Sequence, residues 1–216
     1  MFEGYVCSTC LYLPSGKLGT LLIPDEPITK KNWMKTQLFR SESECNRHCE
    51  VNHGAAGNAK PQKIILFYRS SGEYGYLSNL YKHDITFENR VFRSSEDAYQ
   101  FGKPLDGMVA EWIISAPKPH LCAMAAHGLL SFDITPNWQK IKVSRMLDVL
   151  RVKFMRHEDL NQKLIGTGDA ILIEDSKTDA FWGIGKKRNG KNMLGNLLMQ
   201  VRSELRGGIP WVGERT

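Results

Sequence analysis

Two side chains that could take part in acid–base or nucleophilic chemistry, Glu96 and Lys103, lie seven residues apart in the stretch RSSEDAYQFGK. On an α-helix, seven residues bring the chain round to nearly the same face, about 10 Å along the axis. A carboxylate can move a proton or stabilise positive charge, and a neutral amine can act as a nucleophile. The helix macrodipole also favours Glu in the first turn and Lys in the last, so a helix without a catalytic role fits the same spacing.

A glycine-rich basic stretch, DAFWGIGKKRNGKNMLG at residues 179–195, comes just before an apolar helical pattern. Backbone N–H groups of such a loop, together with Lys191, could surround a phosphate. Trp182 offers a flat face on which a base could stack. The alternatives are a core position for Trp182 and N-cap positions for Asp179 and Asn192.

A third stretch, YGYLSNLY at residues 74–81, places the polar side chains of Ser78 and Asn79 among aromatic residues. It lies between two expected strands and contains the turn residues Gly and Asn. We therefore treat it as a second candidate for substrate contacts.

Four of the five cysteines fall within the first 60 residues, at Cys7, Cys10, Cys45 and Cys49. Two close pairs of this kind are typical of tetrahedral zinc, with His48 and His53 as possible substitutes. The sequence therefore predicts a structural zinc module and linker over residues 1–60, which could also contact nucleic acid. Free cysteines, some of them buried, are the alternative.

Local signals predict the helix that would carry Glu96 and Lys103. Ser94 is a good N-cap with Asp97 three residues later, so the helix should begin near Ser95 and stop at Pro104. Further helices are expected at residues 107–116, 119–130, 143–157 and 192–206. In the third of these, one apolar stripe is formed by Met146, Leu147, Leu150 and Phe154.

Strands are expected at residues 63–69 and 170–175, and as a short pair within 84–92 that turns at Asn89 and Arg90. The fold class is α+β: a mostly helical single domain over residues 61–216 with a few short strands, preceded by the cysteine-rich segment.

The composition is that of a globular protein, with 216 residues and 42% apolar content. The net charge of +6 and a pI near 9.0 are a mild indication of contact with phosphate or nucleic acid. No apolar run long enough to span a bilayer and no secretory signal are present, so we expect a cytoplasmic protein without a membrane partner.

Four blocks of the sequence resemble successive blocks of the NADAR superfamily: FYRSSGEYGYLSNLY, FRSSEDAYQFGK, NWQKIKVSRMLDVLRVKFMRHEDL and TDAFWGIGKKRNGKNMLGNLLMQVRSEL. The resemblance extends over about residues 64–206. This superfamily includes N-glycosidases of riboflavin intermediates and hydrolases that remove ADP-ribose from guanine. The resemblance implies that Glu96 is the acid/base and that Lys103 attacks ribose C1 and forms a Schiff base.

It also implies the residues that bind substrate. Trp182 or Tyr99 would stack on the leaving base, and Asn79, Asp179, Lys191 and Asn192 would hold ribose or phosphate. The remaining candidate contacts are Ser78, Gln100 and Gly183. Where family members often carry acidic residues, this chain has Tyr76 and Ile184, so we expect an altered pocket rim.

We therefore expect an N-glycosidase that removes ADP-ribose from guanine in DNA or RNA, with no cofactor needed for catalysis. One alternative substrate is a phosphorylated riboflavin precursor. The alternative from another class is a non-catalytic module that binds ADP-ribose, an NAD derivative or nucleic acid.

Overall fold

The computed structural model describes residues 2–7, 41–53 and 61–208. The chain divides into two compact units. Unit 1 consists of residues 1–68 and 167–202, and unit 2 consists of residues 69–166 and 203–216. The boundary predicted near residue 60 stays a prediction, because residues 54–60 lie outside the described part.

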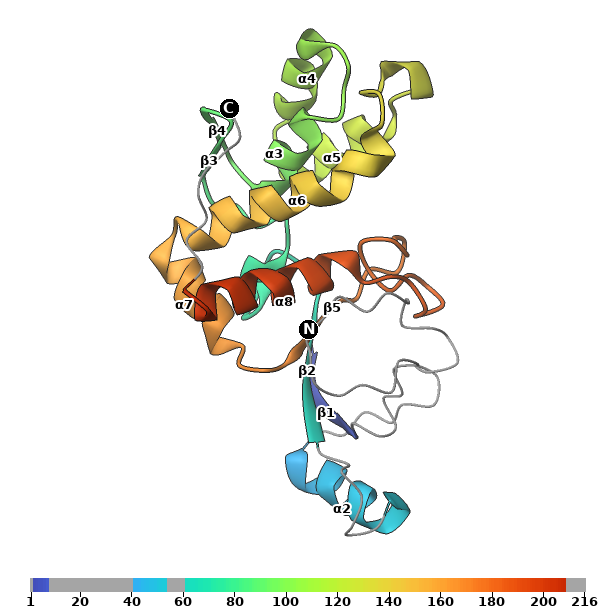
Figure 1. The fold of residues 1–216 in the computed structure, drawn as a ribbon. Coiled ribbons are helices and arrows are strands. Elements are labelled where there is room, and N and C mark those ends of the chain that lie inside the picture. Colours follow the sequence, from blue (N-terminus) through green and yellow to red (C-terminus); the bar gives the residue numbers. More distant parts are fainter. Residues whose placement is uncertain (1, 8–40, 54–60, 209–216) are drawn as a thin grey trace. The chain divides into compact units, whose positions relative to one another are not determined.

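Unit 1 contains a sheet with the strand order β1-β2-β5. Its strands are β1 (Phe2–Cys7), β2 (Pro61–Phe67) and β5 (Ile171–Glu174), with β1 antiparallel and β5 parallel to β2. Figure 1 shows β1 beside β2. The expected apolar strand is thus confirmed as the central one, and the core cluster around it consists of Ile64, Leu66, Ile173 and Ile184.

Two helices complete the described part of unit 1. Helix α2 (Glu42–His53) packs against β1 and β2. Helix α8 (Met193–Arg206) belongs to this unit up to Arg202, and Gly195 brings it so close to β5 that a Cβ there would overlap the Leu172 carbonyl oxygen. A glycine is therefore required where the helix meets the strand.

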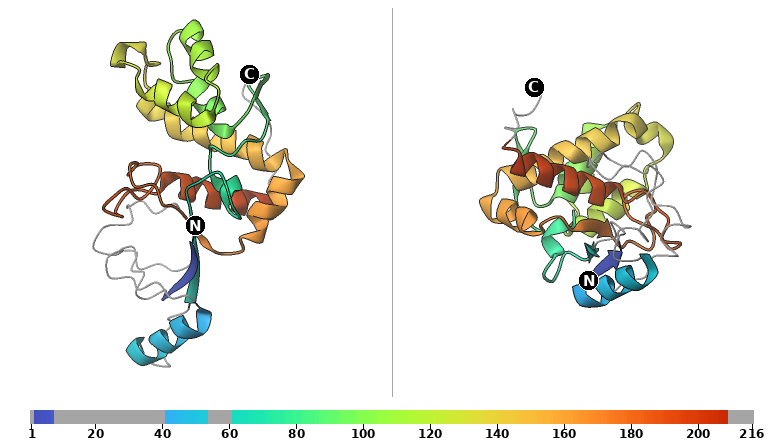
Figure 2. Two further views of the ribbon diagram at one scale, coloured as in Figure 1. Left: turned by 180° about the vertical axis from the view of Figure 1, so that it is seen from behind. Right: turned by 60° about the horizontal axis from the view of Figure 1, so that its bottom comes forward.

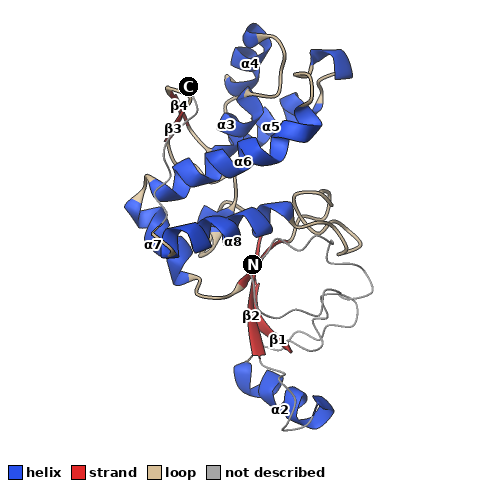
Figure 3. Ribbon diagram, viewed as in Figure 1, coloured by secondary structure: helices blue, strands red, loops and turns tan. Residues whose placement is uncertain are grey.

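Unit 2 is mostly helical (Figure 3). Its helices are α3 (Ser95–Phe101), α4 (Gly107–Ile114), α5 (Pro119–His127), α6 (Trp138–Met155) and α7 (Glu158–Gly166), with short 3₁₀ turns at η1 (Gly75–Leu77) and η2 (Ser131–Asp133). Helix α3 contacts α4, α5 and α6, and Figure 2 shows this group from behind. The short α3 is therefore surrounded by longer elements that can fix its position.

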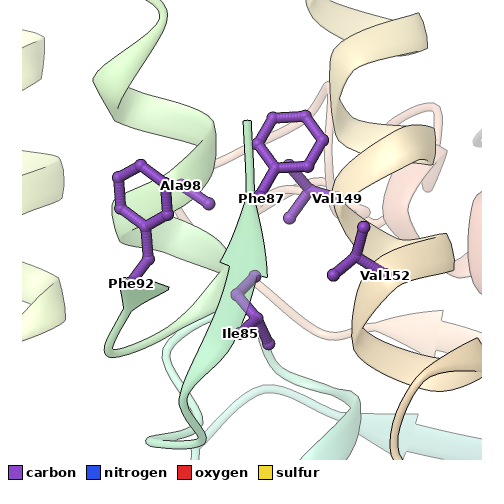
Figure 4. Close-up of a cluster of buried hydrophobic side chains, with 6 residues drawn as sticks. All are labelled: Ile85, Phe87, Phe92, Ala98, Val149 and Val152. Carbon is purple, nitrogen blue, oxygen red and sulfur yellow. The ribbon is translucent and has the colours of Figure 1, made fainter. Parts of the chain in front are cut away.

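A β-hairpin of β3 (Ile85–Phe87) and β4 (Arg90–Phe92) packs on α3 and α6. The apolar side chains at this junction are drawn in Figure 4: Ile85, Phe87, Phe92, Ala98, Val149 and Val152. The turn consists of Glu88 and Asn89, both with positive φ, rather than Asn89 and Arg90 as predicted. Arg90 instead begins β4.

The helical content exceeds the prediction in two places. Helix α6 begins at Trp138 rather than near Val143, and α7 was not predicted. Polar residues dominate both segments, so the apolar period is weak there, although Leu160 and Leu164 of α7 are fully buried at i,i+4 spacing. In the described part of the chain, no helix is long and apolar enough to cross a membrane.

Candidate active site

Helix α3, which carries Glu96, begins as the sequence predicted. The Ser94 backbone is extended and its hydroxyl accepts a hydrogen bond from the Asp97 amide at 3.1 Å, which is N-cap geometry. The amide of Glu96 donates to the Asn79 carbonyl at 3.0 Å. Glu96 is therefore positioned both by its own helix and by the segment that precedes β3.

The Glu96 carboxylate is held by a neighbour one turn along α3. The Nε2 atom of Gln100 donates to Oε1 of Glu96 at 2.7 Å. Gln100 is 3% exposed, and its Oε1 atom has no hydrogen-bond partner among the described residues. A buried acceptor without a partner is costly, so this amide is unusual within the core.

Lys103 follows the end of α3 and is partly buried. Its Nζ atom donates to the Ala126 carbonyl at 2.6 Å. Burial is the largest influence on the pKa of the Lys103 amine and lowers it below its ordinary value. The positive charge of Lys142 also lowers this pKa, and the negative charge of Glu96 raises it. The lowered pKa of Lys103 increases the neutral, nucleophilic fraction of its amine.

The C-terminal end of α3 is fixed by helix α6. The Arg145 guanidinium donates to the carbonyls of Ala98 at 2.8 Å and Tyr99 at 3.3 Å. These are carbonyls that the end of a helix leaves without partners. A Cβ at Gly102 would overlap this guanidinium, so glycine leaves room for Arg145 beside Lys103.

The predicted contacts Ser78 and Asn79 lie in unit 2 with Glu96 and Lys103, and both are buried. The Ser78 carbonyl accepts a hydrogen bond from Lys153 at 2.9 Å. The Nδ2 atom of Asn79 donates to the sulfur of Met146 at 3.3 Å, while its Oδ1 atom has no partner among the described residues. The segment therefore supports Glu96 directly through its backbone.

Tyr99 is 5% exposed and packs on Trp138, with ring centroids 5.2 Å apart. A tyrosine buried in this way serves the core, because a stacked base needs an accessible ring face. Stacking of a base on Tyr99 stays a prediction, as does stacking on Trp182, which is only partly buried.

The backbone amides of the glycine-rich stretch in unit 1 contradict the predicted phosphate cradle. Five successive amides, those of residues 190–194, donate to carbonyls between residues 180 and 184 at distances of 2.8 to 3.1 Å. In chain order, the acceptors are the carbonyls of Ile184, Ala180, Gly183, Phe181 and Trp182. The chain doubles back on itself, and these five amides are satisfied by carbonyls of the same stretch. These amides are not free to bind an anion, so the prediction of a backbone cradle is wrong for them.

The side chains of this loop have two kinds of environment. Oδ1 of Asp179 accepts from the amides of Phe181 and Trp182, both at 2.7 Å, which supports the alternative of a local cap. Lys191 is exposed, and its ammonium lies 5.3 Å from the centroid of the Phe181 ring. Lys191 therefore keeps access to an anionic ligand, whereas the Asp179 carboxylate shapes the turn.

Gly183 and Asn192 shape the same loop. A Cβ at Gly183 would come within 2.8 Å of the Glu174 carbonyl oxygen. The Asn192 side chain is fully buried, accepts from the Glu174 amide and donates to the Leu172 carbonyl, both at 2.9 Å. Both residues thus join the loop to β5, and a direct contact of either with substrate stays a prediction.

The two positions at which this chain departs from the family pattern are buried. Tyr76 is 7% exposed and its hydroxyl donates to the Lys163 carbonyl at 3.0 Å. Ile184 is fully buried in the core of unit 1. Both side chains therefore pack in the interior, and an altered pocket rim stays a prediction.

Most side chains of the predicted zinc module lie outside the part of the chain that the structure describes. Cys10 lies outside the described residues, and the side chains of Cys7 and Cys49 are not described either, although their backbones belong to β1 and α2. Cys45 is buried and forms no disulfide. Among the described residues no cluster of three metal-binding side chains occurs, and the zinc module stays a prediction.

Three cations that contact or influence this site were not singled out from the sequence: Lys142, Arg145 and Lys153. For Lys153 a signal was available, since it lies at helical spacing from Met146 and Leu150, on the buried face of α6. A lysine on an apolar stripe indicates either an error in the helix phase or a buried amine with a specific partner. No comparable local signal marks Lys142 or Arg145.

Comparison with known proteins gives one family. The NADAR domain family model matches residues 66–206. The N-glycosidase YbiA of Escherichia coli (strain K12) is 36% identical over 142 residues, which are 66% of this chain and 88% of YbiA. The riboflavin biosynthesis protein VVA0006 of Vibrio vulnificus (strain YJ016) is 34% identical over 150 residues, which are 69% of this chain and 41% of that protein.

The NMR structure of the E. coli protein YbiA is similar to this fold, with a TM-score of 0.62 and 33% identity over 71% of this chain and 91% of YbiA. The prediction of a helix-rich α+β fold with few short strands is confirmed by this similarity. The names of these relatives agree with the predicted class, an N-glycosyl hydrolase.

Proposed function

The chain belongs to the NADAR domain family, and from that premise we propose that it is an N-glycosidase that hydrolyses the bond between ribose C1 and a base nitrogen. The observation that carries this proposal is the arrangement around α3. A carboxylate oriented by Gln100 lies in the first turn of α3, and an amine with a lowered pKa follows the last turn. A carboxylate can move the proton and stabilise the charge of cleavage at C1, and a neutral amine can attack that carbon.

Glu96 acts on the charge that develops as the base departs. As the C1–N bond breaks, its electron pair leaves with the base, and positive charge builds on C1 and the ring oxygen. The carboxylate stabilises this charge and transfers the proton that the base nitrogen needs. The bond from Gln100 and the backbone contact with Asn79 hold the carboxylate in place.

Lys103 acts as the nucleophile. Its neutral amine forms a bond to C1 as the bond from C1 to the base breaks. The amine then gives up a proton, the bond between C1 and the ring oxygen breaks, and the ring oxygen takes a proton, which leaves a Schiff base at C1. Water then adds to C1, the C1–N bond to Lys103 breaks, and the free sugar and the amine are restored. Partial burial favours the neutral amine that the first step needs.

For the substrate we propose first an ADP-ribosyl group attached to guanine in DNA or RNA. The formal charge of +6 supports a polyanionic partner. In the loop of unit 1, Lys186, Lys187 and Lys191 are exposed. Their side chains are available to phosphates, in contrast to the bonded amides of residues 190–194.

A phosphorylated intermediate of riboflavin biosynthesis is the second candidate. The observation in its favour is that VVA0006, a relative at 34% identity, is named a riboflavin biosynthesis protein. Such a small substrate requires no nucleic-acid surface. Both candidates share the bond that Glu96 and Lys103 would cleave.

The test is chromatography of free base and free sugar after incubation with each candidate substrate. We expect release by the unaltered protein, and loss of at least about 1,000-fold in the Glu96→Gln and Lys103→Met proteins. Treatment with cyanoborohydride during turnover should add the mass of the sugar to the protein but not to Lys103→Met. Tight binding of ADP-ribose without any release of base would instead support a binding module.

A further inference from the structure

Lys153 of α6 is an almost completely buried lysine that the proposed chemistry does not use. It is 1% exposed and, within the described part of the chain, forms no ion pair. Burial lowers its pKa to about 7, so the amine is neutral in a large fraction of molecules at physiological pH. Lysine is rarely retained at such a position without a specific partner.

The partner of Lys153 is a backbone carbonyl. Its Nζ atom donates to the Ser78 carbonyl at 2.9 Å. The surroundings are otherwise aromatic, with the Phe154 and Tyr81 ring centroids at 5.1 and 5.8 Å. A hydrogen bond to a carbonyl requires an N–H group but no charge, so the neutral amine can also make it.

The residue after Ser78 connects this bond to the candidate active site. The Asn79 carbonyl accepts the hydrogen bond from the Glu96 amide at 3.0 Å. Met146 lies seven residues before Lys153, and its sulfur accepts a hydrogen bond from Nδ2 of Asn79 at 3.3 Å. Two residues of α6 thus bond to the consecutive residues Ser78 and Asn79, and Asn79 in turn bonds to the backbone of Glu96.

We propose that Lys153 is a positioning residue that fixes the Glu96 carboxylate through the Ser78–Asn79 segment. This inference rests on the function proposed above for Glu96. Without the Lys153 donor, the Ser78 carbonyl keeps only the hydrogen bond from the Tyr81 amide at 3.2 Å and loses its bond to α6, so the segment shifts. Because Glu96 is attached to that segment by its amide, its carboxylate moves with it.

The test compares Lys153→Met with Lys140→Met, which removes an exposed lysine from the same helix. Methionine is similar in length to lysine and supplies no donor. We expect kcat to fall about tenfold in Lys153→Met with less than about twofold change in KM, because misplacement of the carboxylate affects the transition state. Lys140→Met should match the unaltered protein in both parameters.

A second readout does not depend on activity. Hydrogen exchange at the Glu96 amide, followed by NMR, should become about tenfold faster in Lys153→Met and stay unchanged in Lys140→Met. Unchanged exchange at Glu96 in folded Lys153→Met would overturn the proposal even if kcat falls. Absence of turnover by the unaltered protein would count against the proposed function, and the exchange measurement would still decide the role of Lys153.

Lys153→Gln covers the case in which Lys153→Met does not fold. Its side-chain amide retains an N–H donor for the Ser78 carbonyl. Slow exchange at Glu96 together with a kcat near that of the unaltered protein would support the proposal. A folded Lys153→Gln protein with fast exchange at Glu96 would contradict it, since the donor is present.

Discussion

The loop at residues 175–192 in unit 1 and the surroundings of α3 in unit 2 differ in how their polar groups are satisfied. In the loop, successive amides bond to carbonyls of the same loop, and both ends of the Asn192 side-chain amide bond to β5. Around α3, buried polar atoms of Asn79, Ser95 and Gln100 have no partner among the described residues. Lys103 there has a lowered pKa.

We interpret the loop of unit 1 as a structural scaffold and the surroundings of α3 as the functional site. Loop amides that bond to carbonyls of the same loop add rigidity and are not free to bind a ligand. Buried polar groups without partners reduce stability, and natural proteins tolerate that cost where function requires it. We therefore expect substitutions in the scaffold to affect folding, and substitutions around α3 to affect activity more than folding.

The largest effect on stability is expected from Gly195→Ala. The added Cβ would overlap the carbonyl oxygen of Leu172, a backbone atom that cannot move without disturbing β5. We expect the free energy of unfolding to fall by about 3 kcal/mol, measured by urea denaturation.

Gly107→Ala is the control, since nothing lies within 4 Å of a Cβ at that position in α4. Alanine there should change the free energy of unfolding by less than about 1 kcal/mol, towards higher stability. Equal losses in the two variants would show that the close packing of α8 on β5 is not what Gly195 provides.

A smaller effect, on activity, is expected from Gln100→Met. Methionine has a similar shape but cannot donate to the Glu96 carboxylate, a hydrogen bond worth about 1.5 kcal/mol, so we expect kcat to fall about tenfold. The substitution also removes the buried Oε1 atom that has no partner, so the melting temperature should not fall.

The matched control is Gln162→Met on α7. Gln162 donates to Glu158 with the same i,i+4 spacing at 2.6 Å, but this pair is exposed. Its removal should leave kcat unchanged. A loss of activity as large as that of Gln100→Met would mean that the pair on α3 has no special role.

The smallest effect is expected in the pH dependence of Lys142→Met. The positive charge of Lys142 disfavours protonated Lys103 and so lowers the Lys103 pKa. Without that charge the pKa rises, and the rise of kcat/KM with pH, which follows deprotonation of Lys103, should shift to higher pH. Lys140→Met provides the control, and a shift to lower pH would contradict the assignment of Lys103 as the nucleophile.

The sequence by itself determined the elements whose hydrogen bonds are local. The start of α3 follows from the Ser94 hydroxyl and the Asp97 amide three residues away, and its end precedes Gly102 and Pro104. The central strand β2 follows from a short apolar run. These features depend on neighbours in the chain, so the residue types suffice to predict them.

Only the tertiary structure decided which polar groups remain available. The amides of the glycine-rich loop bond to carbonyls several residues earlier, and Lys153 bonds to Ser78, 75 residues away. Burial, which alone lowers the Lys153 pKa and is the largest cause of the lowered Lys103 pKa, depends on how the helices pack. The sequence thus located the candidate residues on α3 and directly after it. Packing determined which of their neighbours could support chemistry, because desolvation and long-range partners exist only in the folded chain.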